Sequence, residues 1–170
     1  VSGGHTEFTI VKNFNSYKRI GTTIDDALGE AFDKTARLLK LGYPGGPEIE
    51  KFAALGNKDQ FELPMPLIHE NNAHFSFAGL KSAVANIVSK NRCTEKFKKD
   101  MAASFQATIN KIIFTKTQNA ILNYRRVIKT KKKLKIVVAG GVAANKSIRN
   151  SLKVLETSKN CEFLFPSIKY

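Results

Sequence analysis

The chain has 170 residues, 42% of them hydrophobic and 25% charged, which is typical of one globular domain and excludes wholesale disorder. No apolar run reaches the roughly 20 residues that a membrane-spanning helix needs, and no secretory signal pattern is present. Two isolated cysteines, Cys93 and Cys161, indicate free thiols rather than a disulfide framework or a zinc site. We therefore expect a cytoplasmic protein with no membrane segment.

Charge is the strongest compositional signal. Lys and Arg number 28 against 14 acidic residues, for a net charge of +14, and the excess is concentrated in Lys90–Lys99 and Arg125–Lys135. Such a field favours contact with phosphate-rich polyanions. The alternative is a solvated lysine-rich surface, since no aromatic residues are interleaved with the basic run as in a base-stacking platform.

The first third of the chain predicts a β-hairpin followed by a helix. Residues 6–12 and 17–20 have strand character, and residues 25–41 carry apolar side chains at helical spacing. Thr22 or Thr23 is the expected N-cap, and Gly42 the expected end. Residues 43–47 predict a tight turn, and we expect 56–74 to be irregular or a lid.

The remainder predicts helices and short strands in alternation. The expected elements are a strand at 74–77, a helix at 78–88, a long helix capped by Thr94, a buried strand at 134–139, a helix at 143–155 and a strand at 162–165. The long helix carries its apolar stripe on Phe97, Met101, Phe105, Ile109, Ile112 and Ile113. Together they predict an α/β fold with a mixed sheet flanked by helices.

Two glycine pairs follow or adjoin predicted strands and are candidate anion sites. Gly3–Gly4 lies in Val1–Thr6, and Gly140–Gly141 lies between a predicted strand and a helix. Glycine turns let backbone N–H groups approach a phosphate, and a helix start adds a positive dipole end. A purely structural turn remains the alternative for each pair, and the pattern is not a Rossmann fingerprint.

Three acidic side chains share one face of the helix predicted at 25–41, namely Asp26, Glu30 and Asp33. Surface ion pairs with Lys34 and Arg37 are the simpler interpretation. A carboxylate that faces the glycine turns could instead accept hydrogen bonds from ribose hydroxyls.

The histidines give a weaker signal. His5, His69 and His74 have no spacing suited to a metal on one helix face. His5, beside a glycine turn, is the one placed near a candidate site, and a hydrogen-bonded spacer is its alternative role.

Four segments occur in a characteristic order: VSGGHT (1–6), IDDALGEAFDKTARLLKLGYPGGP (24–47), FSFAGLKSAV (75–84) and VVAGGVAAN (137–145). This succession closely resembles the tRNA threonylcarbamoyladenosine synthase family, called TsaD in bacteria, and covers nearly the whole chain. The resemblance implies two RNase-H-like halves of the actin and sugar-kinase (ASKHA) superfamily around a nucleotide cleft. The chain begins at Val1 rather than Met, and we interpret residues 1–170 as a partial chain, most of the second half.

The resemblance also implies site residues. The phosphate and acyl part of the nucleotide would meet Val1, Ser2, Gly3 and Gly4, and its ribose and base would meet Asp33, Gly46 and Asn145. The lysine run suggests tRNA contacts at Arg125, Arg126, Lys131, Lys132 and Lys133.

The family transfers threonylcarbamoyl from threonylcarbamoyl-AMP to the exocyclic N6 amine of the adenosine beside the anticodon. It uses Fe²⁺ or Zn²⁺, and it works with a TsaB-like paralogue and a TsaE-like ATPase. The metal ligands of the family, an H-x-x-x-H motif and the Asp of a T-D-N motif, do not occur in this sequence, so we expect the fragment alone to be inactive. Ala78 stands where the family often has Ser, a change that we expect to be tolerated.

Two other functions are compatible with these residues. The chain could be a catalytically dead nucleotide- or RNA-binding remnant of such an enzyme. It could also belong to a related phosphotransferase, such as a sugar or acetate kinase, which would phosphorylate its substrate with ATP.

Overall fold

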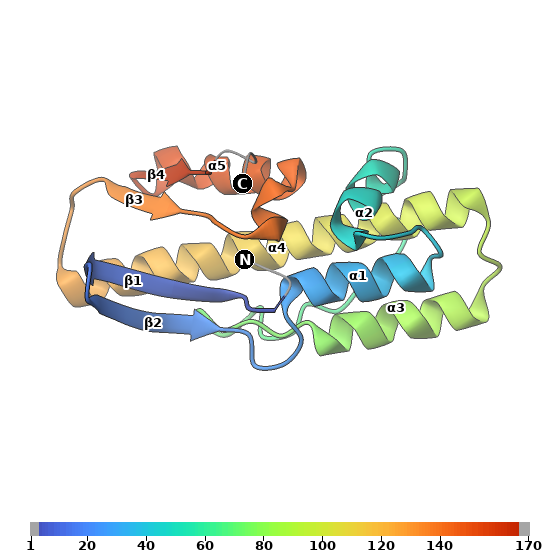
Figure 1. Ribbon diagram of the computed structural model, residues 1–170, viewed down its shortest axis with the longest axis horizontal. Helices are drawn as coiled ribbons and strands as arrows, with labels where there is room; N and C mark the ends of the chain where they lie inside the picture. The colour runs from blue at the N-terminus through green and yellow to red at the C-terminus, as the bar shows by residue number, and fades with distance from the viewer. Residues whose placement is uncertain (1–3, 167–170) are drawn as a thin grey trace.

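The computed structural model describes residues 4–166 (Figure 1). Their elements are β1 (Glu7–Asn13), β2 (Ser16–Thr22), α1 (Leu28–Leu38), α2 (Gly45–Ala53), α3 (Ala78–Lys90), α4 (Glu95–Ile128), β3 (Leu134–Val137), the short 3₁₀ helix η1 (Gly141–Ala144), α5 (Lys146–Ser158) and β4 (Cys161–Leu164).

Helix α4 runs the length of the molecule, and the other elements lie along it (Figure 1). Helices α2 and α5 pack directly against α4, and α1 packs against both α2 and α3. The core lies between these helices. Phe32 of α1 and Phe105 of α4 meet there edge to face, with ring centroids 5.3 Å apart, a favoured aromatic geometry.

The strands form two separate two-stranded sheets within the described residues, so the prediction of one mixed sheet is wrong in that form. β1 and β2 pair antiparallel, whereas β3 and β4 pair parallel. An apolar cavity of about 80 Å³ lies between the two pairs, lined by side chains of β1, β3 and α4. Apolar side chains therefore lie between the two pairs, and no ladder hydrogen bonds join them within the described residues. The α/β class itself is confirmed.

Helix predictions were good where the apolar spacing was strong. Thr94 caps α4 as predicted, its hydroxyl accepting from the Phe97 N–H at 3.2 Å. The predicted cap of α1 at Thr22 or Thr23 is wrong, because α1 begins only at Leu28 and its cap position, Ala27, has no side-chain cap. The Leu28 N–H instead donates to the hydroxyl of Thr6, which precedes β1 (3.0 Å).

Short elements were predicted less well. The turn at 43–47 runs directly into α2, which the sequence analysis did not anticipate. The strand expected at 74–77 is reduced to one isolated bridge, between Thr23 and Phe75. β3 is half-covered rather than buried, since its side chains alternate between partly buried and exposed. The irregular character of 56–74 is confirmed.

Candidate functional site: a groove between α2, α4 and α5

The α1–α2 junction brings two predicted nucleotide residues together. Asp33 accepts a hydrogen bond at Oδ1 from the backbone N–H of Gly45 (2.8 Å). A Cβ at Gly45 would lie 2.6 Å from the Asp33 Cα, so the close approach requires glycine. At Gly46 a Cβ would meet nothing within 4 Å, so this position faces open space. Asp33 of α1 is therefore bonded to the residue that precedes Gly46, at the start of α2. The contact of Asp33 and Gly46 with a nucleotide stays a prediction.

The second glycine pair forms the loop between β3 and α5. Gly140 has φ 98°, in the left-handed region that favours glycine, and the chain then turns through η1. A Cβ at Gly141 would meet no atom within 4 Å. η1 packs against α1, the helix that carries Asp33. The fold therefore places this loop beside the helix that holds the predicted ribose ligand.

Asn145, the last predicted residue of this loop, is 6% exposed. Its Oδ1 accepts from the Ile148 N–H (2.9 Å), which caps α5, and its Nδ2 donates to Oε1 of Gln106 on α4 (2.9 Å). The amide thus has a structural role that the sequence analysis did not predict. The second hydrogen on Nδ2 has no hydrogen-bond partner within residues 4–166. The contact of Asn145 with a base stays a prediction.

The first glycine pair lies at the edge of the described chain. Val1, Ser2 and Gly3 fall outside the described residues, so their predicted roles and the expected pairing of Gly3 with Gly141 stay predictions. Gly4 is exposed, with open space where a Cβ would lie. Thr6 and Ala139, which border the two glycine loops, line the same small cavity.

A larger groove, of about 650 Å³, opens between α2, α4 and α5. Its walls combine small apolar side chains, amides and lysines. They are contributed by Pro47, Glu50, Lys51, Ala53, Ala54, Lys58, Ala103, Gln106, Ala107, Asn110, Lys146, Ser147 and Asn150. Glu50 of α2 links two of the walls, because its Oε1 accepts from the Ser147 N–H at the start of α5 (3.0 Å). Two lining residues, Pro47 and Lys146, directly follow Gly46 and Asn145 in the chain.

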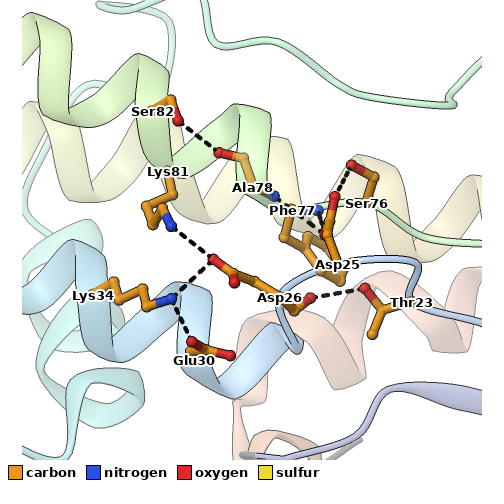
Figure 2. Close-up of polar contacts among 10 residues, drawn as sticks. All are labelled: Thr23, Asp25, Asp26, Glu30, Lys34, Ser76, Phe77, Ala78, Lys81 and Ser82. Carbon is orange, nitrogen blue, oxygen red and sulfur yellow. Dashed lines mark hydrogen bonds and ion pairs between the residues drawn. The ribbon is translucent and has the colours of Figure 1, made fainter.

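The ion-pair interpretation holds for two of the three acids in residues 25–41. Asp26, just before α1, pairs with both Lys34 and Lys81 at 3.1 Å, and Lys34 also pairs with Glu30 (Figure 2). Burial opposes ionisation of Asp26, but hydrogen bonds from Lys81 and Lys34 outweigh it and hold the pKa of Asp26 below its usual 3.8. Asp33, which bonds Gly45 instead, is the exception.

Asp25 has a role that the sequence analysis missed. Its Oδ1 accepts from the N–H groups of Phe77 (2.7 Å) and Ala78 (3.3 Å), and its Oδ2 accepts from the Ser76 hydroxyl (Figure 2). Asp25 thus caps the start of α3 from the loop before α1. A cap contributed from more than 50 residues away has no local sequence signal.

In the basic run at 125–135, Arg125 has a structural role, whereas several other side chains are exposed. Arg125 donates from NH1 to the carbonyls of Thr130 and Lys132, and from NH2 to those of Lys159 and Asn160, so its guanidinium clamps two turns. Arg126 and Lys131–Lys133 are exposed, and Lys133 forms a surface pair with Glu162 at 3.2 Å. A tRNA contact stays a prediction, and the exposed members suit it better than Arg125 does.

Within residues 4–166, no three His, Cys, Asp or Glu side chains come together in a way that could hold a metal ion. Among the same residues, no helix is long and apolar enough to cross a membrane. His74 lies against the backbone of Thr22, with its Nδ1 3.3 Å from the backbone nitrogen.

Comparison with known proteins identifies the family. The TsaD family, described as tRNA N6-adenosine threonylcarbamoyltransferase, matches residues 1–170. The chain belongs to this family. Three relatives carry the same description. The chain is 51% identical to the one from Pelagibacter ubique over 168 residues, 46% identical to the one from Bartonella henselae over 174 residues and 44% identical to the one from Rickettsia massiliae over 168 residues. These alignments cover 98–99% of the chain but 46–49% of each relative, so the chain spans about half the length of the relatives.

The groove contains polar residues that the sequence analysis did not select. Glu50 stands one helical turn after Gly46, and Gln106 and Asn110 are polar residues four apart on α4. These amides directly follow the stripe residues Phe105 and Ile109, at positions that in the sequence look like ordinary exposed helix positions. No local signal therefore selects them.

Proposed function

We propose that this chain carries the adenylate-binding part of a tRNA N6-adenosine threonylcarbamoyltransferase. The observation that supports it best is the groove between α2, α4 and α5. Its lining residues Pro47 and Lys146 directly follow the predicted nucleotide residues Gly46 and Asn145. Its volume of about 650 Å³ falls within the range of about 300–1,000 Å³ common for small-molecule sites.

The groove offers three chemistries that a nucleotide needs. Small alanines of α2 and α4 leave apolar surface against which a flat base can pack. Lys51, Lys58 and Lys146 are exposed at its walls and supply positive charge for a phosphate. Glu50 has one oxygen bonded to Ser147 and a second that can accept from a ribose hydroxyl.

The proposed reaction is acyl transfer from threonylcarbamoyl-AMP to tRNA. The adenosine N6 attacks the carbamoyl carbonyl carbon, the bond from that carbon to the phosphate oxygen breaks, AMP leaves, and N6 gives up a proton. This chain's part would be to hold and orient the adenylate, which lowers the entropic cost of the transfer. Residues 4–166 contain no cluster of His, Cys, Asp or Glu side chains that fits the expected Fe²⁺ or Zn²⁺.

The nucleic-acid partner in this proposal is tRNA. The exposed side chains of Arg126 and Lys131–Lys133 surround the turn that Arg125 clamps, and together with the net charge of +14 they suit phosphate contacts. The TsaB-like and TsaE-like partners, the cytoplasmic location and the two-lobed RNase-H-like (ASKHA) architecture, with this chain as most of its second half, remain part of the proposal by family resemblance.

Calorimetry of the chain with AMP and with threonylcarbamoyl-AMP tests the binding part of the proposal. We expect saturable binding that Glu50→Gln weakens, because it replaces the charged acceptor. Glu48→Gln, on α2 but outside the groove, is the matched control and should bind normally. No binding of either adenylate by the folded chain would refute the nucleotide site.

A hybrid enzyme tests the transfer activity. Residues 1–170 would replace the matching part of the Pelagibacter ubique relative, and tRNA modification would be measured beside the unaltered relative. We expect an active hybrid. A folded hybrid that binds adenylate but does not modify tRNA would favour the alternative, a catalytically dead nucleotide-binding remnant.

A further inference from the structure

We infer that Ser147 binds the ligand of the groove as a hydrogen-bond donor, and that a relay of three buried or half-buried amides fixes its hydroxyl in that role. The inference rests on the proposed nucleotide site and names a residue for it. It follows from the polarity of one continuous chain of hydrogen bonds.

The chain of hydrogen bonds begins at a backbone group whose role is fixed. The Ile148 N–H can only donate, so the side-chain atom of Asn145 that it meets at 2.9 Å must be the oxygen. The Asn145 nitrogen then donates to the Gln106 oxygen at 2.9 Å. Each carboxamide has one oxygen and one nitrogen, so fixing one end fixes the other.

The same logic carries the polarity into the groove. The Gln106 nitrogen donates to the Asn110 oxygen at 2.9 Å, and the Asn110 nitrogen donates to the Ser147 Oγ at 2.7 Å. The hydroxyl of Ser147 therefore accepts from the relay. Its own hydrogen has no partner among the described residues and is left to donate.

The position of that hydrogen gives it a ligand. Gln106, Asn110 and Ser147 all line the groove, next to the lysine at 146. Gln106 is only 4% exposed, and Asn145 behind it is 6% exposed, so water has little access to reorient these amides. A free O–H donor beside an ammonium group suits an electron-rich acceptor, such as a phosphate or ribose oxygen of an adenylate.

Two isosteric substitutions should reverse the last bond of the relay. In Asn110→Asp the side chain keeps an oxygen for Gln106 but presents a second oxygen to Ser147, so the serine hydrogen turns to the carboxylate. In Gln106→Glu the second carboxylate oxygen meets Asn110, whose amide must rotate and offer its oxygen to Ser147. Both changes withdraw the serine donor from the groove.

Titration of the full chain with AMP and with uncharged adenosine tests the inference. We expect Ser147→Ala to weaken AMP binding about tenfold, the effect of one hydrogen bond to a charged acceptor. Asn110→Asp should weaken it by a similar factor beyond any charge repulsion. Asn150→Asp adds the same charge to the groove without a relay contact and serves as the control for repulsion.

The double variant Ser147→Ala/Asn110→Asp then decides whether the relay acts through the serine. We expect it to bind no more weakly than Ser147→Ala once the effect of Asn150→Asp is subtracted. The relay is overturned if the losses of AMP affinity in Ser147→Ala and Asn110→Asp add fully in the double variant. It is also overturned if Asn110→Asp weakens AMP binding no more than Asn150→Asp does. Normal binding by Ser147→Ala overturns the serine contact and leaves the nucleotide site standing, whereas no binding by the unaltered chain overturns the site and this inference with it.

Discussion

Lys116 is the most buried charged residue between residues 4 and 166, and its replacement by methionine should loosen the segment between α2 and α3. Lys116 lies on α4 with 0% of its surface exposed. Its Nζ donates to the carbonyls of Leu67 (2.5 Å) and Glu70 (2.9 Å) and lies 3.3 Å from the Asn72 Oδ1 and 3.4 Å from its carbonyl. One ammonium group therefore holds the end of an irregular segment against the central helix.

The expected cost follows from what each oxygen keeps. The Nδ2 of Asn119 also donates to the carbonyls of Glu70 (3.1 Å) and Asn72 (3.2 Å), so these two retain a partner without Lys116. The Leu67 carbonyl still accepts from the Glu70 N–H (3.0 Å) and the Asn72 Oδ1 from the His74 N–H (3.0 Å), so no acceptor is left without a partner. The variant instead loses hydrogen bonds to a charged group, of which the two shortest contribute about 1.5–3 kcal/mol each. Methionine removes the cost of burying a charge and fills a similar volume. We therefore expect Lys116→Met to destabilise the fold by about 2–3 kcal/mol, less than the roughly 3–6 kcal/mol of those two bonds, because the buried charge is removed as well.

Urea denaturation of Lys116→Met and of Lys111→Met measures this effect. Lys111 lies on the same helix but is exposed, and its substitution controls for the loss of one surface charge. A slope of roughly 2 kcal/mol per M would convert the expected loss into a midpoint lower by about 1–1.5 M. A midpoint equal to that of Lys111→Met would refute the assignment of Lys116 as the clamp.

The pH dependence provides a second readout of the same group. Burial lowers the pKa of Lys116 below its usual 10.5, and the charge of Glu70 opposes this only in part. The unfolded chain then binds more protons than the folded one between the lowered pKa and 10.5, so wild-type stability should rise with pH across that window. Lys116→Met should lack this rise, and an identical pH profile in both proteins would contradict it.

Three further predictions concern the site and its supports. Gly45→Ala should cost about 1–3 kcal/mol by overpacking against the α1 backbone, whereas Gly46→Ala, in open space, should leave the melting temperature unchanged. Asp26→Asn should lower the free energy of unfolding near neutral pH. The difference in this free energy between variant and wild type should shrink as the pH falls through the depressed pKa of Asp26, as measured by unfolding at a series of acidic pH values. Ala107→Leu should fill the groove, abolish AMP binding in calorimetry and leave the fold intact; undiminished binding would place the nucleotide elsewhere.

The sequence predicted the elements whose signals are local. Apolar spacing gave the helices, and Thr94 gave the start of α4 because a cap acts within four residues. The failures share one cause. The Leu28 N–H at the start of α1 donates to the hydroxyl of Thr6, and the Phe77 N–H at the start of α3 donates to Asp25. Such partners are supplied by the tertiary fold rather than by neighbours in the chain.

The candidate site was predicted in the same uneven way. The tight turn at 43–47 was predicted from its prolines and glycines, whereas Glu50 and Ser147 become neighbours only when α2 meets α5. The polar residues of α4 resemble ordinary surface positions in the sequence. Gln106 is instead buried because its amide has partners on both sides.

The groove itself follows from how α4 uses its polar residues. Large side chains at 53, 54, 103 and 107 would fill the groove, but all four are alanine and line open space. Alanines alone would leave an apolar interface free to collapse, since small residues allow close helix approach. The Ser147 N–H donates to Glu50 of α2, and the Asn110 amide of α4 donates to the Ser147 hydroxyl. These two bonds fix α5 against both helices, so the open volume persists. The polar links and the alanines must act together, because removing the links permits collapse and enlarging the alanines fills the space.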